Sequence, residues 1–229
     1  MMTFALQLVP LTLLGTLLGL DAVSFPQAMI SRPIVAATLG GALVGESAKG
    51  LLIGVILELF ALETLPFGAS RYPEWGSASV VGGALFGMQP QINAGALAMS
   101  TFAALSTAFI GGWSMVQHRK LIAHWAGNLR EQIAAGSADA IMTLQLRGLT
   151  SDLVRGGLMT FVALLVFVPL TQVVLATGTF DLAPARNLVV AAAGAVGAGA
   201  VWKVVHTTKG APWYFLGGLI AGGTLLFVT

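Results

Sequence analysis

The most informative shortage in this sequence of 229 residues is charge. Only 9% of the residues are Asp, Glu, Lys or Arg, whereas a soluble domain carries about 25%. The formal net charge is +2, which is too small to indicate a nucleic-acid partner. So few charged groups predict a chain that lies in a lipid bilayer, where exposed ions are costly.

Cysteine is missing altogether. Its absence excludes disulfides, thiolate metal sites and a phosphocysteine. The three histidines, His118, His124 and His206, lie in cation-rich stretches and show no metal-binding spacing. The chain also lacks a glycine-rich phosphate loop with a lysine, a nucleophile elbow and a His-Glu-x-x-His motif. We therefore expect no cofactor, no metal and no catalytic residues of its own.

What the chain does contain is long apolar sequence. Hydrophobic residues make up 56%, and the mean hydropathy is +0.88. The apolar runs are continuous, which favours helices over a β-barrel. We predict an all-α integral membrane protein, a polytopic helix bundle with short discontinuous or re-entrant helices, forming one domain over residues 1–229. Residues 3–20 are expected to be a retained first helix and not a cleaved signal peptide.

Two apolar segments, 33–45 and 50–62, are too short for a straight crossing, which needs about 20 residues. Short or glycine-interrupted hydrophobic stretches are typical of discontinuous helices at a transporter's binding site. Two tilted helices extended by polar flanks are the alternative. Residues 64–76 carry two prolines and two glycines, so they are expected to be irregular. A short helix should follow at 77–89, and a full span at 92–116.

Residues 117–155 hold five of the 11 Lys and Arg residues, which predicts a cytoplasmic segment by the positive-inside rule. Gly136-Ser137 should divide it into two short helices. The first is expected to be amphipathic and to lie on the membrane surface or on the protein. Its apolar residues recur every four positions: Leu121, Trp125, Leu129 and Ile133. Further spans are expected at 156–177, 187–202 and 212–228.

The region 21–76 combines apolar sequence with charge, and charges at membrane depth mark a functional site by default. Glu58 has apolar residues on both sides, so its carboxylate needs a partner. The candidates are Arg32, Lys49, Arg71 or a polar ligand. Glu58 is thus either half of a structural ion pair or a hydroxyl-binding or gating group.

Three other side chains in this region suit a sugar. Glu74 lies in the irregular stretch beside Tyr72 and Trp75, and acids with aromatic rings commonly line polar ligand sites. An interfacial loop anchored by the Trp is the alternative. Gln27 and Ser31 can each donate and accept hydrogen bonds. They suit a neutral polyol, or they act as helix caps.

Three stretches together resemble the IIC subunit of mannose/fructose/sorbose-family phosphotransferase (PTS) sugar transporters. They are Gln27-Ala-Met-Ile-Ser-Arg-Pro-Ile-Val-Ala36, Gly50-Leu-Leu-Ile-Gly-Val-Ile-Leu-Glu-Leu-Phe60 and Phe67-Gly-Ala-Ser70. The resemblance is strong across residues 15–88. In the rest of the chain it is a moderate resemblance in the general layout of the segments. One departure is Arg71-Tyr72-Pro73-Glu74, where the family often has Pro-Pro-Asp.

The resemblance implies a permease (EIIC) of the cell inner membrane that binds and translocates a small neutral sugar. It also implies a IID membrane subunit, IIA and IIB phosphocarriers that phosphorylate the sugar, elevator-like transport and a trimeric assembly. A non-transporting structural or regulatory subunit on the same scaffold is the alternative. The expected substrate-binding residues are Gln27, Ser31, Arg32, Glu58, Gly68, Ala69 and Glu74.

Overall fold

The protein is described here by a computed structural model that covers residues 6–21, 24–62, 71–177 and 183–228. Within these ranges the regular structure is helical and contains no strand, which confirms the all-α class. The helices in chain order are α2 (Val9–Asp21), α3 (Pro33–Leu43), α4 (Ser47–Ala61), α5 (Trp75–Gly87), α6 (Ala94–Asn128), α7 (Arg130–Ala134), α8 (Ala138–Ala176), α9 (Ala183–Val205) and α10 (Ala211–Val228).

Helix α5 lies at the centre of the bundle. Every residue of α5 except Trp75 is buried, and α2, α3, α4, α6 and α8 pack around it. A Cβ atom at Gly83 would lie 2.1 Å from the carbonyl oxygen of Ala37 in α3, and one at Gly76 would lie 2.3 Å from that of Leu18 in α2. These two crossings therefore require glycine, as in many closely packed membrane helices.

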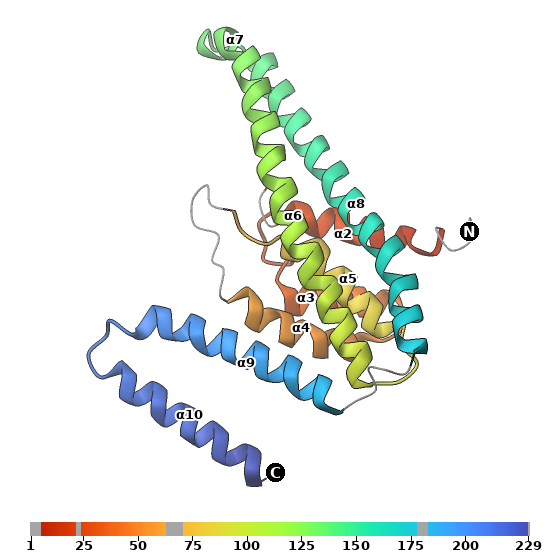
Figure 1. The fold of residues 1–229 in the computed structure, drawn as a ribbon. Helices are drawn as coiled ribbons and strands as arrows, with labels where there is room; N and C mark the ends of the chain where they lie inside the picture. The colour runs from red at the N-terminus through yellow and green to blue at the C-terminus, as the bar shows by residue number, and fades with distance from the viewer. Residues whose placement is uncertain (1–5, 22–23, 63–70, 178–182, 229) are drawn as a thin grey trace.

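Helices α6 and α8 are much longer than the others. At 1.5 Å per residue, their 35 and 39 residues correspond to about 52 and 58 Å, well beyond the roughly 30 Å of a bilayer's hydrocarbon core. In the described part of the chain, these two are long and apolar enough to cross a membrane. Their distal halves leave the body together as a hairpin, with α7 at its tip (Figure 1).

The hairpin corrects two sequence expectations. The span expected to end at residue 116 continues unbroken to Asn128, and the second helix of the 117–155 segment is the start of the 39-residue α8. The break at Gly136-Ser137 is confirmed, since Gly136 has φ +76° and the hydroxyl of Ser137 caps α8. Between Arg119 and Asn128 no proline interrupts the helix, so it runs through the change from apolar to charged sequence.

The two short apolar segments form α3 and α4, a tight helical hairpin that turns at Gly45. Gly45 has φ +85°, a backbone conformation that glycine adopts readily. Helix α3 has 11 residues and α4 has 15, or about 16 and 22 Å. Both are shorter than the hydrocarbon core, and a re-entrant arrangement stays a prediction.

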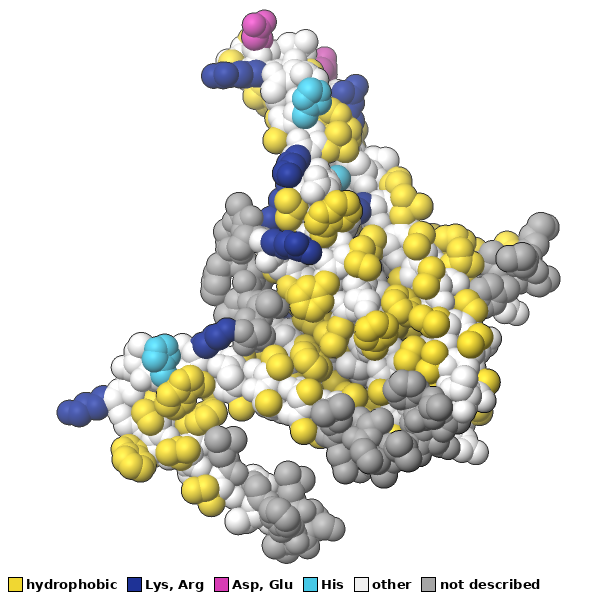
Figure 2. All heavy atoms as spheres, viewed as in Figure 1, with side chains coloured by type: hydrophobic (Ala, Val, Ile, Leu, Met, Phe, Trp, Pro, Cys, Tyr) yellow, Lys and Arg dark blue, Asp and Glu magenta, His cyan; other side chains and the backbone are white. Residues whose placement is uncertain are grey.

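On the face seen in Figure 2 the body is largely apolar, and Lys and Arg lie on the α6–α8 hairpin and beside the turn between α9 and α10. Along α8, Leu158, Val162 and Val173 are each more than half exposed, an arrangement suited to lipid contact. Helix α9 packs against α4 and α6, while α10 extends from α9 away from the body (Figure 1).

Candidate sugar-binding site

The loop of residues 24–32 connects α2 to α3 and carries three of the predicted site residues. Asp21, the last residue of α2, is buried, and its carboxylate oxygens accept the backbone N–H groups of Ala28 (2.7 Å) and Ser31 (2.9 Å). Gln27 and Met29 have positive φ angles of 59° and 61°, which non-glycine residues adopt rarely. Asp21 thus holds the backbone of a loop with an uncommon conformation.

Arg32 ends this loop and forms an ion pair with Glu58 of α4. The other carboxylate oxygen of Glu58 accepts the backbone N–H of Ile34 (3.2 Å) in the first turn of α3. A carboxylate is favoured there because the first N–H groups of a helix lack partners within the helix. The side chain of Arg32 is 42% exposed and that of Glu58 is 18% exposed, so a ligand could still reach both.

The choice among the three cationic partners is therefore settled in favour of Arg32. Lys49 donates to the backbone oxygen of Gln89 (2.6 Å) and lies 3.2 Å from Glu46. Arg71 donates to the backbone oxygen of Phe109 at 3.5 Å. Both of these cations bind backbone oxygens that are distant in sequence.

Glu74 is completely buried and caps the N-terminus of α5. Its Oε1 accepts the backbone N–H of Ser77 (3.0 Å), and its own N–H donates to the carbonyl of Ala108 in α6 (2.9 Å). Its Oε2 is buried and has no hydrogen-bond partner among the described residues. Glu74 therefore lies inside the bundle and not in an interfacial loop, with one acceptor oxygen unused.

The predicted site residues fall into two groups on either side of the last turn of α2. One group is the 24–32 loop with the Arg32–Glu58 pair, held through Asp21. The other is Glu74, which lies against Gly19, two residues before Asp21 in α2, where an added Cβ would be 3.6 Å from Oε1. Gly68 and Ala69 lie outside the described residues.

The capping alternative for Gln27 and Ser31 does not apply to α3. The N-cap position of α3 is Arg32, whose side chain makes no capping hydrogen bond, and the side chain that accepts an N–H of the first turn is Glu58. Ser31 instead contacts Asp21, through its backbone N–H and also through its side chain.

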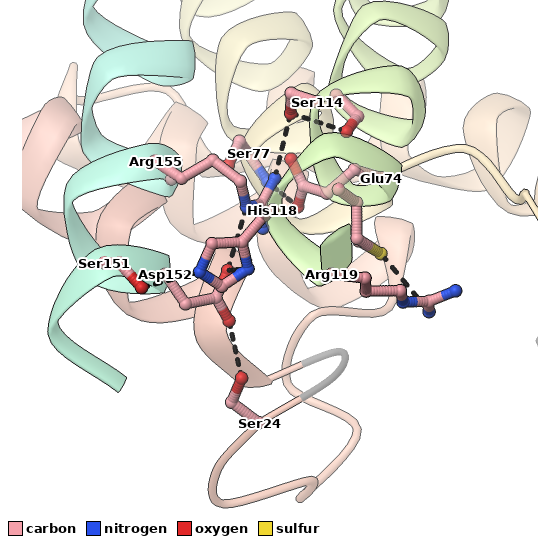
Figure 3. Close-up of polar contacts among 12 residues, drawn as sticks. Ser24, Glu74, Ser77, Ser114, His118, Arg119, Ser151, Asp152 and Arg155 are labelled. Carbon is pink, nitrogen blue, oxygen red and sulfur yellow. Dashed lines mark hydrogen bonds and ion pairs between the residues drawn. The ribbon is translucent and has the colours of Figure 1, made fainter. Parts of the chain in front are cut away.

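A second polar cluster, which the sequence did not predict, lies where the hairpin joins the body (Figure 3). Asp152 is 2% exposed and pairs with Arg155, whose Nε lies 2.8 Å from Oδ1. Ser24 donates its hydroxyl to Oδ2 of Asp152 at 2.5 Å. Arg155 also donates to Ser114 of α6 (3.3 Å), and His118 Nε2 lies 2.7 Å from Ser151 Oγ.

The sequence does not reveal this cluster, because the charge of residues 117–155 predicts a cytoplasmic segment. The available signal was the spacing of Asp152 and Arg155, three residues apart and followed by a long apolar stretch without a break. Such a pair on one face of a helix is placed to enter the bundle together. In the described residues, no group of three or more His, Cys, Asp or Glu is arranged to hold a metal ion.

Comparison with known families gives the decisive result. Residues 5–226 match the family model described as the PTS system sorbose-specific IIC component. The chain belongs to this family. The resemblance noted in the sequence is thereby confirmed for nearly the whole IIC chain.

Two further comparisons place this IIC component among known proteins. A 77-residue stretch is 32% identical to the fructose permease IIC component of Bacillus subtilis (strain 168), covering 34% of this chain and 28% of that relative. The match thus spans less than a third of the relative's length. A solved structure titled "Structure of membrane protein" has a TM-score of 0.73 at 20% identity, covering 97% of this chain and 92% of its own. That chain has the same fold.

Two of the three stretches that resemble other IIC subunits meet in space. The stretch 27–36 supplies Arg32, the stretch 50–60 supplies Glu58, and the ion pair joins them. The third stretch, 67–70, lies outside the described residues.

Proposed function

We propose that this IIC component is the membrane permease subunit of a phosphoenolpyruvate-dependent sugar phosphotransferase system. It binds a neutral sugar and carries it across the inner membrane for phosphorylation by IIA and IIB partners. Family membership supports the class of protein. The observation that carries the site is the partly exposed ion pair of Arg32 and Glu58 beside the loop of Gln27 and Ser31.

The chemistry of this pair suits a sugar. Each sugar hydroxyl is both a donor and an acceptor, and the pair offers guanidinium donors next to carboxylate acceptors. Hydrogen bonds to charged groups contribute about 1.5–3 kcal/mol each. Gln27 and Ser31 would add neutral hydrogen bonds, and the unused Oε2 of Glu74 an acceptor. Gly68 and Ala69, on the segment that leads to Glu74, complete the proposed set.

The α6–α8 hairpin is the surface we propose for the cytoplasmic phosphocarriers. It carries Arg119, Lys120, Arg130 and Arg147, against the acids Glu131 and Asp139. Arg130 lies beyond Asn128, the end of α6, which is about 13 Å further along the hairpin than Arg119, or more than one Debye length at physiological salt. At that distance it is better placed for a soluble anionic partner than for lipid headgroups. A IID subunit and a trimeric assembly belong to the same proposal.

One observation favours the alternative, a non-transporting subunit on the same scaffold. Glu74 is fully buried and caps α5, so this acid has a structural role without any sugar. The alternative predicts that Glu74 affects folding only.

Uptake measurements distinguish the two. Cells that express this chain with its IIA, IIB and IID partners would be given labelled mannose, fructose and sorbose, with Glu58→Gln, Glu74→Gln and, as control, Glu46→Gln. Glu46 is also an acid in an ion pair, but it is half-exposed and at the turn between α3 and α4. We expect uptake to fall about 10-fold or more in Glu58→Gln, the loss of one charged hydrogen bond, and to persist in the control.

Equal uptake by wild type, Glu58→Gln and Glu74→Gln would reject the site assignment. If the wild-type set takes up none of the three sugars, the non-transporting alternative is favoured. Membrane levels of every variant would be compared by immunoblot, so that lost uptake is not confused with lost protein.

A further inference from the structure

The 24–32 loop is attached to the bundle at two points by buried carboxylates from different helices. Asp21 at the end of α2 binds the backbone of the loop's second half, at Ala28 and Ser31. Asp152 of α8 binds its first residue, Ser24, at 2.5 Å. A hydroxyl that donates to a carboxylate makes one of the stronger protein hydrogen bonds. Residues 128 positions apart in sequence are thus joined next to the candidate site.

Asp152 is itself held in place by its neighbours (Figure 3). Its Oδ1 lies 2.8 Å from Nε of Arg155 and 3.9 Å from Nδ1 of His118, which leaves Oδ2 for Ser24. Arg155 is fixed in turn by Ser114 of α6. Because Asp152 and Arg155 are both at least nine-tenths buried and paired, the carboxylate is a rigid acceptor.

The loop needs such attachment because its conformation is unfavourable on its own. Gln27 and Met29 both have φ near +60°, and residues in this region persist only where the surroundings fix them. The loop is otherwise exposed at residues 24–30, so few packing contacts hold it there. A free loop would relax toward negative φ angles and move Gln27 and Ser31.

We propose that Asp152 is a positioning residue for sugar binding: through Ser24 it holds the 24–32 loop so that Gln27, Ser31 and Arg32 face the substrate together. This inference rests on the proposed function, since it assumes that the loop contacts the sugar. It assigns a role in the permease to the base of the hairpin, where the polar cluster contacts the loop through Ser24. Asp152 acts through Ser24 and not on the sugar directly.

The test removes the link and leaves the Asp152–Arg155 pair intact. Ser24→Ala deletes the hydroxyl at an exposed position, where folding should be unaffected. Ser24→Thr restores a hydroxyl at the same place. The matched control is Thr150→Ala on α8, because Thr150 is exposed and its hydroxyl donates to the carbonyl of Leu146 in its own helix.

Two readouts are used with the assembled transporter. Peptide-level hydrogen–deuterium exchange over residues 24–32 reports the Asp21-bound amides of Ala28 and Ser31. Sugar uptake reports KM and the maximum rate separately. We expect Ser24→Ala to speed exchange several-fold and to raise KM by about 5-fold, the equivalent of one ordinary hydrogen bond, with little change in maximum rate. Ser24→Thr should restore both values, and Thr150→Ala should change neither.

Unchanged exchange in Ser24→Ala would overturn the proposal, because the loop would not depend on Asp152. Faster exchange with an unchanged KM would also overturn it, since the loop would be held without serving the sugar. If the wild-type transporter takes up no sugar, the proposed function fails, and the exchange data still decide whether Asp152 holds the loop.

Discussion

At the scale of single residues, the two acids predicted to bind substrate differ in their surroundings. Glu58 lies at the edge of the bundle, paired with a half-exposed arginine. Glu74 is enclosed, and one of its oxygens supports the first turn of α5. Both carboxylates lie at helix N-termini, where unpaired N–H groups favour an anion. Their different exposure predicts different consequences for stability.

Replacing Glu58 should have little effect on stability. Its partner Arg32 is 42% exposed, and solvent-exposed ion pairs contribute about 0–1 kcal/mol. We expect Glu58→Gln to lower the free energy of unfolding by about 1 kcal/mol or less, measured by thermal unfolding in detergent. A large loss of stability would show that the pair is chiefly structural.

Replacing Glu74 should depend on what takes its place. Glu74→Ala removes the cap of α5 and is expected to cost about 0.5–2 kcal/mol, in addition to leaving a cavity. Glu74→Gln keeps a side-chain oxygen that can accept the N–H of Ser77, so its loss should be smaller. The same unfolding measurement checks the order. If both variants lost the same free energy of unfolding, the capping contact with Ser77 would not be what Glu74 contributes to stability.

At the scale of elements, the bundle depends on helices that pack closely, backbone against backbone, at glycine residues. The crossing of α3 and α5 brings Gly83 against the carbonyl of Ala37. The expectations for 33–45, 50–62 and 77–89 all correspond to helices, because their length and apolar composition are local properties of the sequence. Their packing partners are not local properties of the sequence. A glycine at a tight helix crossing and a glycine with open space around it cannot be told apart in the sequence.

Gly83→Ala tests this crossing. The new methyl group would lie 2.1 Å from a backbone oxygen, so α3 and α5 must separate. Overpacking of this kind typically costs about 1–3 kcal/mol. Gly199→Ala in α9 is the control, because nothing lies within 4 Å of its added Cβ. We expect a lower unfolding temperature only for Gly83→Ala, and equal temperatures would contradict the close packing.

At the scale of the whole molecule, the hairpin separates a charged part from an apolar body. The charge of residues 117–155 can be read directly from the sequence, so a charged segment distinct from the apolar body was predictable. The sequence did not predict that α6 and α8 are continuous, because the transition from apolar to charged sequence resembles the end of a span. It also could not choose Arg32 as the partner of Glu58 or bring Asp152 to Ser24, since both contacts depend on tertiary structure.

The tip of the hairpin should be reachable from the cytoplasm. Glu131 in α7 is exposed, and the chain has no native cysteine. A Glu131→Cys variant should react with a membrane-impermeant maleimide in inside-out vesicles and stay unlabelled in intact cells. Val80→Cys in α5 is the control, because Val80 is 0% exposed and should react only after denaturation. Labelling of Glu131→Cys in intact cells would reverse the predicted orientation.

The central position of α5 also constrains the order of biosynthesis. The apolar core around Val80 and Leu85 includes Leu164 and Val168 of α8, which are made some 80 residues later. A ribosome adds roughly 5–20 residues per second, so α5 waits for several seconds before its last neighbour exists. During that interval the side of α5 that packs on α8 has no final partner, whereas the α2 and α3 neighbours of Gly76 and Gly83 are already made. A helix that is almost fully buried in the finished protein is therefore incompletely covered while the rest of the chain is made.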